Sequence, residues 1–387
     1  MNLLHITTHK LKIPNVVLAE GLVVTDDTGK QYLDLESGVW CLSLGHNNSD
    51  VNAAMVEQMK KIVHCGFNYS AANVAHSASM LCEKVGFDEG SAVFLCSGSE
   101  GVELCSQMAK HLTGNNRLMT LHDSYLGSYS SLKNRSDNWH LFDWTDCVAC
   151  AETTHCNANC EKIQQIPDNI AAFIFEPGSS SGYVRFPPSS LISELASAVR
   201  ERGGYVIVND VTTGVGRTGK WFGFQHYDIH PDFVAVGKGI GNGYPVSAAV
   251  MSESVCSELK NRPFIYAQSH QNDALGAAVV TSVIDYIDRH QLIANAEQMG
   301  QRLLHGLTRL VDGDCITAVR GRGLMLAIDF KSAEKTEQFH DALLQHGVIA
   351  GNRGTALRVD PPLTIDTVTV DKVLEIFSSV VSQLSAE

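Results

Sequence analysis

The feature that most constrains this chain is a set of short apolar runs, each followed at once by small, hydroxyl or charged residues. The runs are rich in β-prone residues, which predicts strands buried on both faces of a sheet. Amphipathic stretches separate them, such as the stripe from Leu191 to Val199, for which Ser189 or Ser190 is the expected N-cap. Strands that alternate with helices predict an α/β fold with a mainly parallel sheet. The runs are residues 92–95, 171–175, 205–208 and 233–236.

The length and charge of the chain limit its organisation and its partners. A chain of 387 residues predicts more than one domain, which we place as a large domain over 51–283 and a small α+β domain over 284–387 that also takes in the N-terminal segment 1–50. A net charge of −13 opposes binding to a phosphate backbone, so we expect no nucleic acid partner. No apolar stretch approaches the ~18 residues of a membrane span. We therefore expect no membrane association and a cytoplasmic location.

The residues that follow the runs are the candidates for a site. Ligands of parallel α/β sheets bind beyond the carboxyl ends of the strands. Ser97-Gly98-Ser99 follows the first run and opens a helical pattern, where glycine and free amides could hold a phosphate. The alternative is a plain turn with a serine cap. Lys238 follows the fourth run between two glycines, where a desolvated amine could attack a carbonyl, the alternative being a solvated loop lysine.

A larger set of motifs shares one order along the chain. The longest run is Asp210-Val-Thr-Thr-Gly-Val-Gly-Arg-Thr-Gly219, followed by Gly237-Lys238-Gly239-Ile240-Gly241-Asn242-Gly243-Tyr244-Pro245. Glu176-Pro177 precedes these motifs, and Leu357-Arg358-Val359-Asp360-Pro361-Pro362-Leu363 follows them. With these motifs the sequence resembles the class III (ω-amino acid) aminotransferases, which are pyridoxal phosphate enzymes of fold type I. The resemblance covers nearly the whole chain.

The resemblance implies a fold-type-I aminotransferase that acts as a homodimer and uses pyridoxal 5'-phosphate. It implies that Lys238 forms the Schiff base with the cofactor and moves the proton, while an amine or amino acid donor and a keto acid such as 2-oxoglutarate or pyruvate exchange the amino group. Arg358 would bind a substrate carboxylate, or else form a surface ion pair, and Trp40 would line the substrate pocket, or else belong to the core. Tyr125 would stack on the cofactor ring, or else be a core residue. The remaining cofactor-binding residues implied are Ser97, Gly98, Ser99, Glu176, Asn209, Val211, Thr212 and, contributed by the partner subunit, Ser269.

Two departures from the family pattern change the expected chemistry. Asn209-Asp210 stands where the family has Asp-Glu, so a neutral amide would face the ring nitrogen unless Asp210 takes over. Because neighbouring strand residues point to opposite faces, we favour Asn209. Ser181 stands where dual-substrate members carry a glutamate that pairs with the arginine, so we expect Arg358 to lack a counter-ion. A free arginine would disfavour substrates without a carboxylate.

Several other hypotheses remain at this stage. An amino acid racemase or epimerase would use the same scaffold, and Asn209 also leaves open a catalytically weak binding protein. Residues 214–219 spell G-x-G-x-x-G, as in NAD-dependent oxidoreductases, but the next residues do not read as a helix. We expect no metal, although one cluster could bind zinc as an alternative to reduced free thiols. That cluster is Cys147, Cys150, Cys156 and Cys160.

Overall fold

The computed structural model describes residues 11–66, 68–135, 137–153, 156–181 and 183–386. Its largest element is a seven-stranded sheet with the order β4-β10-β9-β8-β7-β5-β6. Strands β6, β5, β7, β8 and β9 run parallel, whereas β10 is antiparallel to both β9 and β4. This confirms the predicted α/β class and the mainly parallel sheet. The strands are β4 (Ser91–Leu95), β5 (Arg117–Leu121), β6 (Trp139–Phe142), β7 (Ile170–Phe175), β8 (Tyr205–Asn209), β9 (Phe233–Val236) and β10 (Ser247–Met251).

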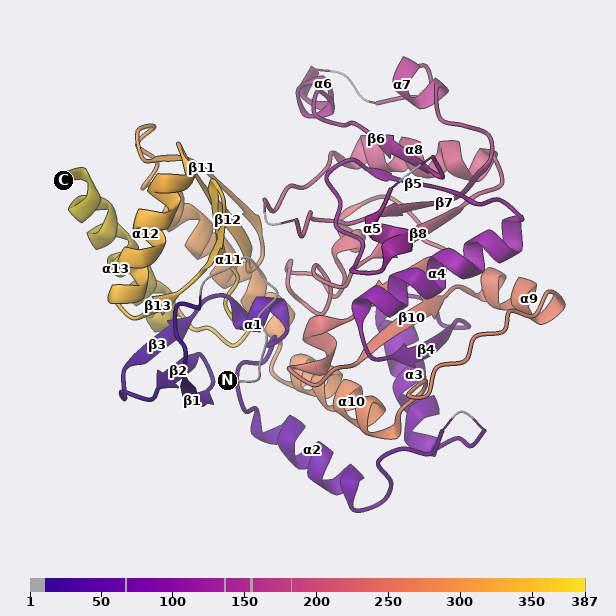
Figure 1. Ribbon diagram of the computed structural model, residues 1–387, viewed down its shortest axis with the longest axis horizontal. Coiled ribbons are helices and arrows are strands. Elements are labelled where there is room, and N and C mark those ends of the chain that lie inside the picture. The colour runs from indigo at the N-terminus through magenta and orange to yellow at the C-terminus, as the bar shows by residue number, and fades with distance from the viewer. Residues whose placement is uncertain (1–10, 67, 136, 154–155, 182, 387) are drawn as a thin grey trace.

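Helices cover both faces of this sheet (Figure 1). Helix α8 packs with Val206 and Val208 of β8 in one apolar cluster, while α4 packs with Ile207 in another. Successive residues of a central strand therefore pack against helices on opposite faces of the sheet, which explains why the central runs are apolar at every position. Pro188, not Ser189 or Ser190, occupies the N-cap of α8, so the expected serine cap is wrong. The helices of this part are α2 (Ser49–Met59), α3 (Ala72–Val85), α4 (Gly98–Thr113), α5 (Ser130–Lys133), α6 (Cys147–Thr153), α7 (Glu161–Gln164), α8 (Ser189–Glu201), α9 (Glu253–Asn261) and α10 (Ala274–Arg289), with 3₁₀ turns η1 (Gly223–His226) and η2 (Lys238–Gly241).

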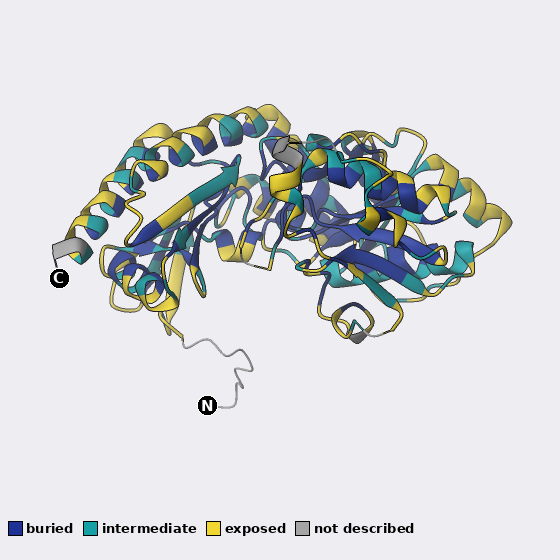
Figure 2. Cartoon of the chain, turned by 90° about the horizontal axis from the view of Figure 1, so that it is seen from above, coloured by how far each residue is buried: buried dark blue, intermediate teal, exposed yellow. Residues whose placement is uncertain are grey.

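The two ends of the chain build two four-stranded sheets, with the orders β1-β2-β3-β13 and β11-β12-β15-β14. Helices α11 and α12 pack on the second of these sheets, and α13 packs on both helices. Figure 2 shows the strands mostly buried and the outer faces of the helices exposed. Among the described residues, no helix has the length and apolar character that a bilayer crossing requires. The elements are β1 (Val16–Glu20), β2 (Val23–Asp26), β3 (Gln31–Asp34), α1 (Ser37–Trp40), α11 (Leu292–Thr308), β11 (Ile316–Arg322), β12 (Met325–Phe330), α12 (Ala333–Gln345), β13 (Val348–Ile349), β14 (Gly351–Arg353), β15 (Ala356–Val359) and α13 (Thr367–Ala386).

Candidate active site

The N-terminus of α4 forms one wall of the site. Ser97 is the N-cap. Its hydroxyl accepts from the backbone amide of Glu100, and the Glu100 carboxylate accepts from the backbone amide of Ser97, which together form a capping box. The amides of Gly98 and Ser99 open the helix, where no carbonyl of the preceding turn can accept from them. The Ser99 hydroxyl accepts a hydrogen bond from the amide of Ser128 at 3.1 Å, so its own proton stays free to donate. This helix end is therefore suited to bind an anion.

Lys238 follows β9 and begins the 3₁₀ turn η2. Its backbone is left-handed, with φ of 49°, which turns the side chain back towards the end of β8. The ammonium Nζ donates to Thr212 Oγ1 at 3.0 Å. Burial lowers the pKa of Lys238, while nearby Cys41 and Glu176 partly oppose that shift. A lowered pKa increases the fraction of neutral amine, the form that attacks a carbonyl.

Asn209 and Asp210, at the end of β8, point to opposite sides, as the strand alternation predicts. Asn209 Nδ2 donates to the carbonyl oxygen of Tyr125 at 3.0 Å. Asp210 is fully buried on the other side, where it accepts from the amides of Gly223 at 2.9 Å and Phe224 at 3.1 Å. Burial raises the pKa of Asp210 to about 6. The amide, and not the carboxylate, thus faces the α4 side of the sheet.

One cavity of about 140 Å³ joins these groups. It includes seven of the residues expected from the resemblance. Four other residues also line it: Val102 on α4, and Leu126, Gly127 and Ser180 on loops, where no periodic signal marks residues as neighbours. The expected residues that line the cavity are Gly98, Ser99, Tyr125, Asn209, Val211, Thr212 and Lys238.

Glu176 lies behind the cavity and holds its wall. One carboxylate oxygen accepts from the amide of Tyr125 at 2.7 Å, and the other accepts from the hydroxyl and the amide of Ser180. Burial raises the pKa of Glu176 to about 7, and the hydrogen bonds from Ser180 and Tyr125 oppose the shift. Like Glu176, two other expected residues do not line this cavity. Ser97 is the cap of α4, and Ser269 is exposed on the segment before α10.

Trp40 and Arg358 meet beside Lys238, outside the lining of that cavity. The Arg358 guanidinium carbon lies 3.7 Å from the centre of the Trp40 ring, and Lys238 Nζ lies 5.4 Å from the same centre. Arg358 is fully buried, and its Nη2 donates to Glu36 Oε1 at 2.9 Å. The expectation that Arg358 lacks a counter-ion is therefore wrong, because Glu36 supplies one from a distant part of the chain. The alternative of a surface ion pair is wrong as well, because Arg358 is fully buried.

The segment that carries Glu36 and Trp40 has an unusual backbone. Ser37, Gly38, Val39 and Trp40 all have positive φ, between 50° and 65°. Left-handed conformations cost roughly 1–2 kcal/mol per non-glycine residue, so surrounding contacts must hold this turn. Two hydrogen bonds join this turn to the end of β15. Ser37 Oγ donates to the carbonyl oxygen of Asp360 at 2.6 Å, and the amide of Asp360 donates to the carbonyl oxygen of Leu35 at 2.7 Å.

Comparison with known proteins decides the family. The sequence profile of the class III aminotransferases (Aminotransferase class-III) matches residues 7–381. The chain belongs to this family. As a class III aminotransferase it is an enzyme of the pyridoxal-phosphate-dependent type, as its motifs predict. The fold-type-I expectation is confirmed as well.

Individual relatives of this class III aminotransferase differ in reaction. The acetylornithine aminotransferase of Methanopyrus kandleri is 30% identical over 375 residues, which are 96% of this chain and 95% of the relative. A leucine/methionine racemase of Thermococcus litoralis is 27% identical, with 93% and 88% coverage. Among solved structures, an amine transaminase from an uncultivated Pseudomonas species superposes with a TM-score of 0.89 at 22% identity, and 99% of each chain is covered. At 22% identity, the similarity to the amine transaminase structure concerns the fold alone.

The oxidoreductase and metal hypotheses gain no support from the described residues. The G-x-G-x-x-G stretch from Gly214 to Gly219 forms successive turns and opens no helix, as a dinucleotide fingerprint would require. Within the described ranges, three potential metal ligands gather only at His64, His270 and Asp273, and both ring nitrogens of His64 already have partners. Cys147, Cys150, Cys156 and Cys160 form no disulfide and lie in the segment between β6 and β7. A zinc ion on them stays an untested alternative.

Proposed function

We propose that this class III aminotransferase transfers an amino group from an amine or amino acid donor to a keto acid such as 2-oxoglutarate or pyruvate. The observation that carries the proposal is the convergence of a buried amine, an anion-binding helix end and a ring-facing amide on one cavity. Lys238, Ser99 and Asn209 supply these three groups from three different strand ends.

The residues present fit pyridoxal 5'-phosphate. The free amides of Gly98 and Ser99, together with the Ser99 hydroxyl, suit the phosphate, and Ser269 of a second copy would complete that set. Tyr125 and Val211 flank the space where the ring would lie, and Thr212 would lie beside Lys238. Gly98 and Gly237 pack closely against each other, because a Cβ on Gly237 would lie 3.2 Å from the Gly98 Cα. When bound, the cofactor supplies an aldehyde that bonds to amines and a ring that accepts electrons from the substrate carbon.

The residues of the chain would do the proton transfer and the positioning. Lys238 Nζ is the base that would take a proton from the substrate carbon and return it, because burial favours its neutral form. Thr212 holds that nitrogen at 3.0 Å. Asn209 would offer an amide to the ring nitrogen, which stabilises a positive charge there less than a carboxylate does. Glu176 positions Tyr125 and Ser180 from behind.

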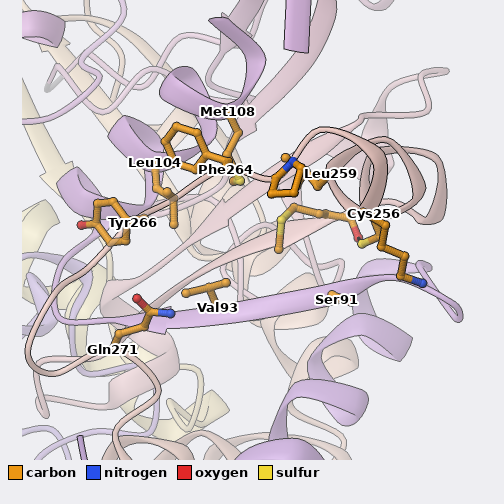
Figure 3. Close-up of a pocket in the computed structure, with 12 residues that line it drawn as sticks. Ser91, Val93, Leu104, Met108, Cys256, Leu259, Phe264, Tyr266 and Gln271 are labelled. Atoms are coloured by element: carbon orange, nitrogen blue, oxygen red, sulfur yellow. Dashed lines mark hydrogen bonds between the residues drawn. The ribbon is translucent and has the colours of Figure 1, made fainter. Parts of the chain in front are cut away.

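A homodimer is part of the proposal. An apolar cavity of about 370 Å³ opens between β4, α4 and α9, where Val93, Leu104, Met108, Cys256 and Leu259 project into one space (Figure 3). The segment from Pro263 to Gln271 borders it and carries Ile265, whose side chain is 91% exposed. A second copy that covers this face would bury Ile265 and would bring Ser269 towards another site.

Domain boundaries near residues 50 and 283 and a cytoplasmic location complete the proposal. The seven-stranded sheet uses strands between Ser91 and Met251, and the other two sheets use strands from both ends of the chain, which supports the boundaries. None of the eleven cysteines forms a disulfide, which favours a reducing compartment.

The test is the variant Lys238→Ala, with Lys220→Ala as its control. Lys220 is exposed and donates only to the Gln225 carbonyl at 2.7 Å, so its loss should leave activity unchanged. We expect Lys238→Ala to lose the visible absorbance of the covalently held cofactor and at least 10³-fold of the transamination rate. Transamination that survives in Lys238→Ala would refute the assignment.

Racemisation is the second candidate, and the relative named leucine/methionine racemase is the observation that favours it. Both reactions would use Lys238, but only transamination converts an amino acid into a keto acid. A single enantiomer incubated with the holoenzyme and no acceptor distinguishes them by chiral chromatography. Appearance of the other enantiomer without keto acid would replace the proposed transfer by racemisation.

A further inference from the structure

We propose that Asn209 keeps the ring nitrogen of the cofactor unprotonated by donating an amide proton to it, so that the enzyme works with a neutral pyridine and not with a pyridinium. The inference rests on the proposed function, in which Asn209 faces that nitrogen, and it adds the charge state of the ring. It concerns this chain in particular, since Asn209 stands where the family has an aspartate. The charge matters because a neutral ring draws fewer electrons from the substrate carbon than a protonated one.

Two contacts fix the orientation of the buried Asn209 amide. The carbonyl oxygen of Tyr125 can only accept, so the atom that faces it at 3.0 Å is Nδ2. The backbone amide of Val211 can only donate, so the atom that faces it at 3.4 Å is Oδ1. Nδ2 carries two protons, and within the described residues only one of them has an acceptor. The second proton is therefore left for a ligand, and a neutral ring nitrogen is an acceptor for it.

The surroundings of Asn209 suit an amide better than a carboxylate. An aspartate in its place would turn an oxygen towards the Tyr125 carbonyl oxygen, to which Nδ2 now donates. Leu126 is buried, lines the same cavity and offers no side-chain donor to a carboxylate. Glu176 accepts from the Tyr125 amide at 2.7 Å and so anchors Tyr125 in place. The Tyr125 carbonyl therefore favours an amide at position 209, because a carboxylate there would lose this hydrogen bond.

The cavity offers no carboxylate that could stabilise a protonated ring. Among the described residues, none of those that line it is acidic, and Lys238 is a cation whenever it is protonated. Asp210 lies on the opposite side, where its carboxylate accepts from backbone amides. The Glu176 carboxyl lies behind Tyr125, and burial raises its pKa to about 7. Because an amide carries no net charge and a nearby cation disfavours a second positive charge, the neutral ring is the favoured form.

A neutral ring makes the proton transfer depend more on Lys238. A ring that withdraws fewer electrons leaves the substrate carbon a weaker acid, so its proton is harder to remove. The base must then supply more of the driving force, and Thr212 holds Lys238 Nζ at 3.0 Å for this task. Asn209 would thus set how strongly the cofactor assists the base, whichever reaction follows.

The experiment measures the protonation state of the ring nitrogen in the holoenzyme. Wild type, Asn209→Asp and Asn261→Asp are loaded with pyridoxal 5'-phosphate that carries ¹⁵N in its ring, and the nitrogen resonance is recorded. Asn261 is exposed at the end of α9 and outside the cavity lining, so its variant is the matched control for the added charge. We expect the resonance of a neutral pyridine in wild type and in Asn261→Asp. We expect Asn209→Asp to shift it upfield to that of a pyridinium, because a carboxylate stabilises the added proton.

The cofactor-free proteins test the part of Tyr125. We expect Asn209→Asp to lower the Tm by roughly 2 °C, because the Tyr125 carbonyl loses its donor. Asn261→Asp should melt as wild type does. An Asn209→Asp protein with the wild-type Tm would refute the claim that Tyr125 favours an amide.

A pyridinium resonance in wild type would overturn the inference. An unchanged resonance in folded Asn209→Asp would overturn it as well, because Asn209 would then not face the ring nitrogen. If Asn209→Asp does not fold, the wild-type spectrum alone decides the charge of the ring. The measurement needs no turnover, so a neutral ring in an enzyme that does not transaminate would refute the proposed function and retain the role of Asn209. A pyridinium in an enzyme that transaminates would do the reverse.

Discussion

At the scale of single residues, the site combines positions that the sequence predicts with positions that it does not. Strand alternation alone places Asn209 and Asp210 on opposite sides, and the structure agrees. No periodicity relates Glu36 to Arg358, which lie 322 positions apart, so their ion pair contradicts the sequence-based expectation for Arg358. Patterns over a few residues can assign a face, but a contact between distant segments depends on tertiary packing.

Glu176 gives the prediction at this scale. Its folded pKa of about 7 is raised by burial above an ordinary value of 4.5, so the protonated form is favoured in the folded state. The stability that this proton contributes is complete below about pH 4.5 and is lost as the pH rises through 7. We expect wild type to lose on the order of 3 kcal/mol more unfolding free energy between pH 4.5 and 8 than Glu176→Gln does. Urea unfolding across that range measures the difference, and the exposed Glu161→Gln should behave as wild type. Parallel pH profiles for wild type and Glu176→Gln would contradict the assignment.

At the scale of elements, the strongest sequence signals gave the most accurate predictions. The helical pattern that Ser97-Gly98-Ser99 was expected to open is α4, and Ser97 caps it, because a helix start with its capping box is a local feature. Strands β5, β6 and β10 were not predicted. Strand β10 consists of Ser-Ala-Ala-Val-Met and lies between β4 and β9, next to one edge of the sheet; three of its five side chains are small and give little apolar signal. The N-cap of α8 was misplaced because Pro188 starts that helix without any side-chain cap.

The cap of α4 gives the prediction for an element. Ser97→Ala removes the acceptor of the Glu100 amide, so we expect the unfolding free energy of the cofactor-free protein to fall by about 1 kcal/mol. Ser97→Thr keeps the acceptor and should retain most of it. Urea denaturation monitored by circular dichroism measures both variants. Equal losses in the two variants would mean that the capping hydrogen bond contributes nothing measurable.

At the scale of the whole molecule, the prediction concerns association. Ile265 is 91% exposed, so Ile265→Asp should leave the fold of one chain intact while it places a charge in the proposed interface. Val368, 77% exposed on α13, provides a matched control in Val368→Asp. We expect at least a tenfold higher dimer dissociation constant for Ile265→Asp only. Sedimentation velocity over a range of concentrations measures this constant, and identical behaviour of the two variants would place the interface elsewhere.

The contact between Glu36 and Arg358 also sets an order of events during synthesis. Chains are made at roughly 5–20 residues per second, so a separation of 322 residues delays the second partner by tens of seconds. Until then the strained turn at Ser37–Trp40 lacks the strand end that holds it. A nascent chain can therefore have made all the strands of its seven-stranded sheet, which end at Met251, while the turn at Ser37–Trp40 still lacks Arg358 and Asp360. Premature termination before residue 358 would yield a product that contains Lys238 but lacks Arg358, the residue proposed to bind the substrate carboxylate.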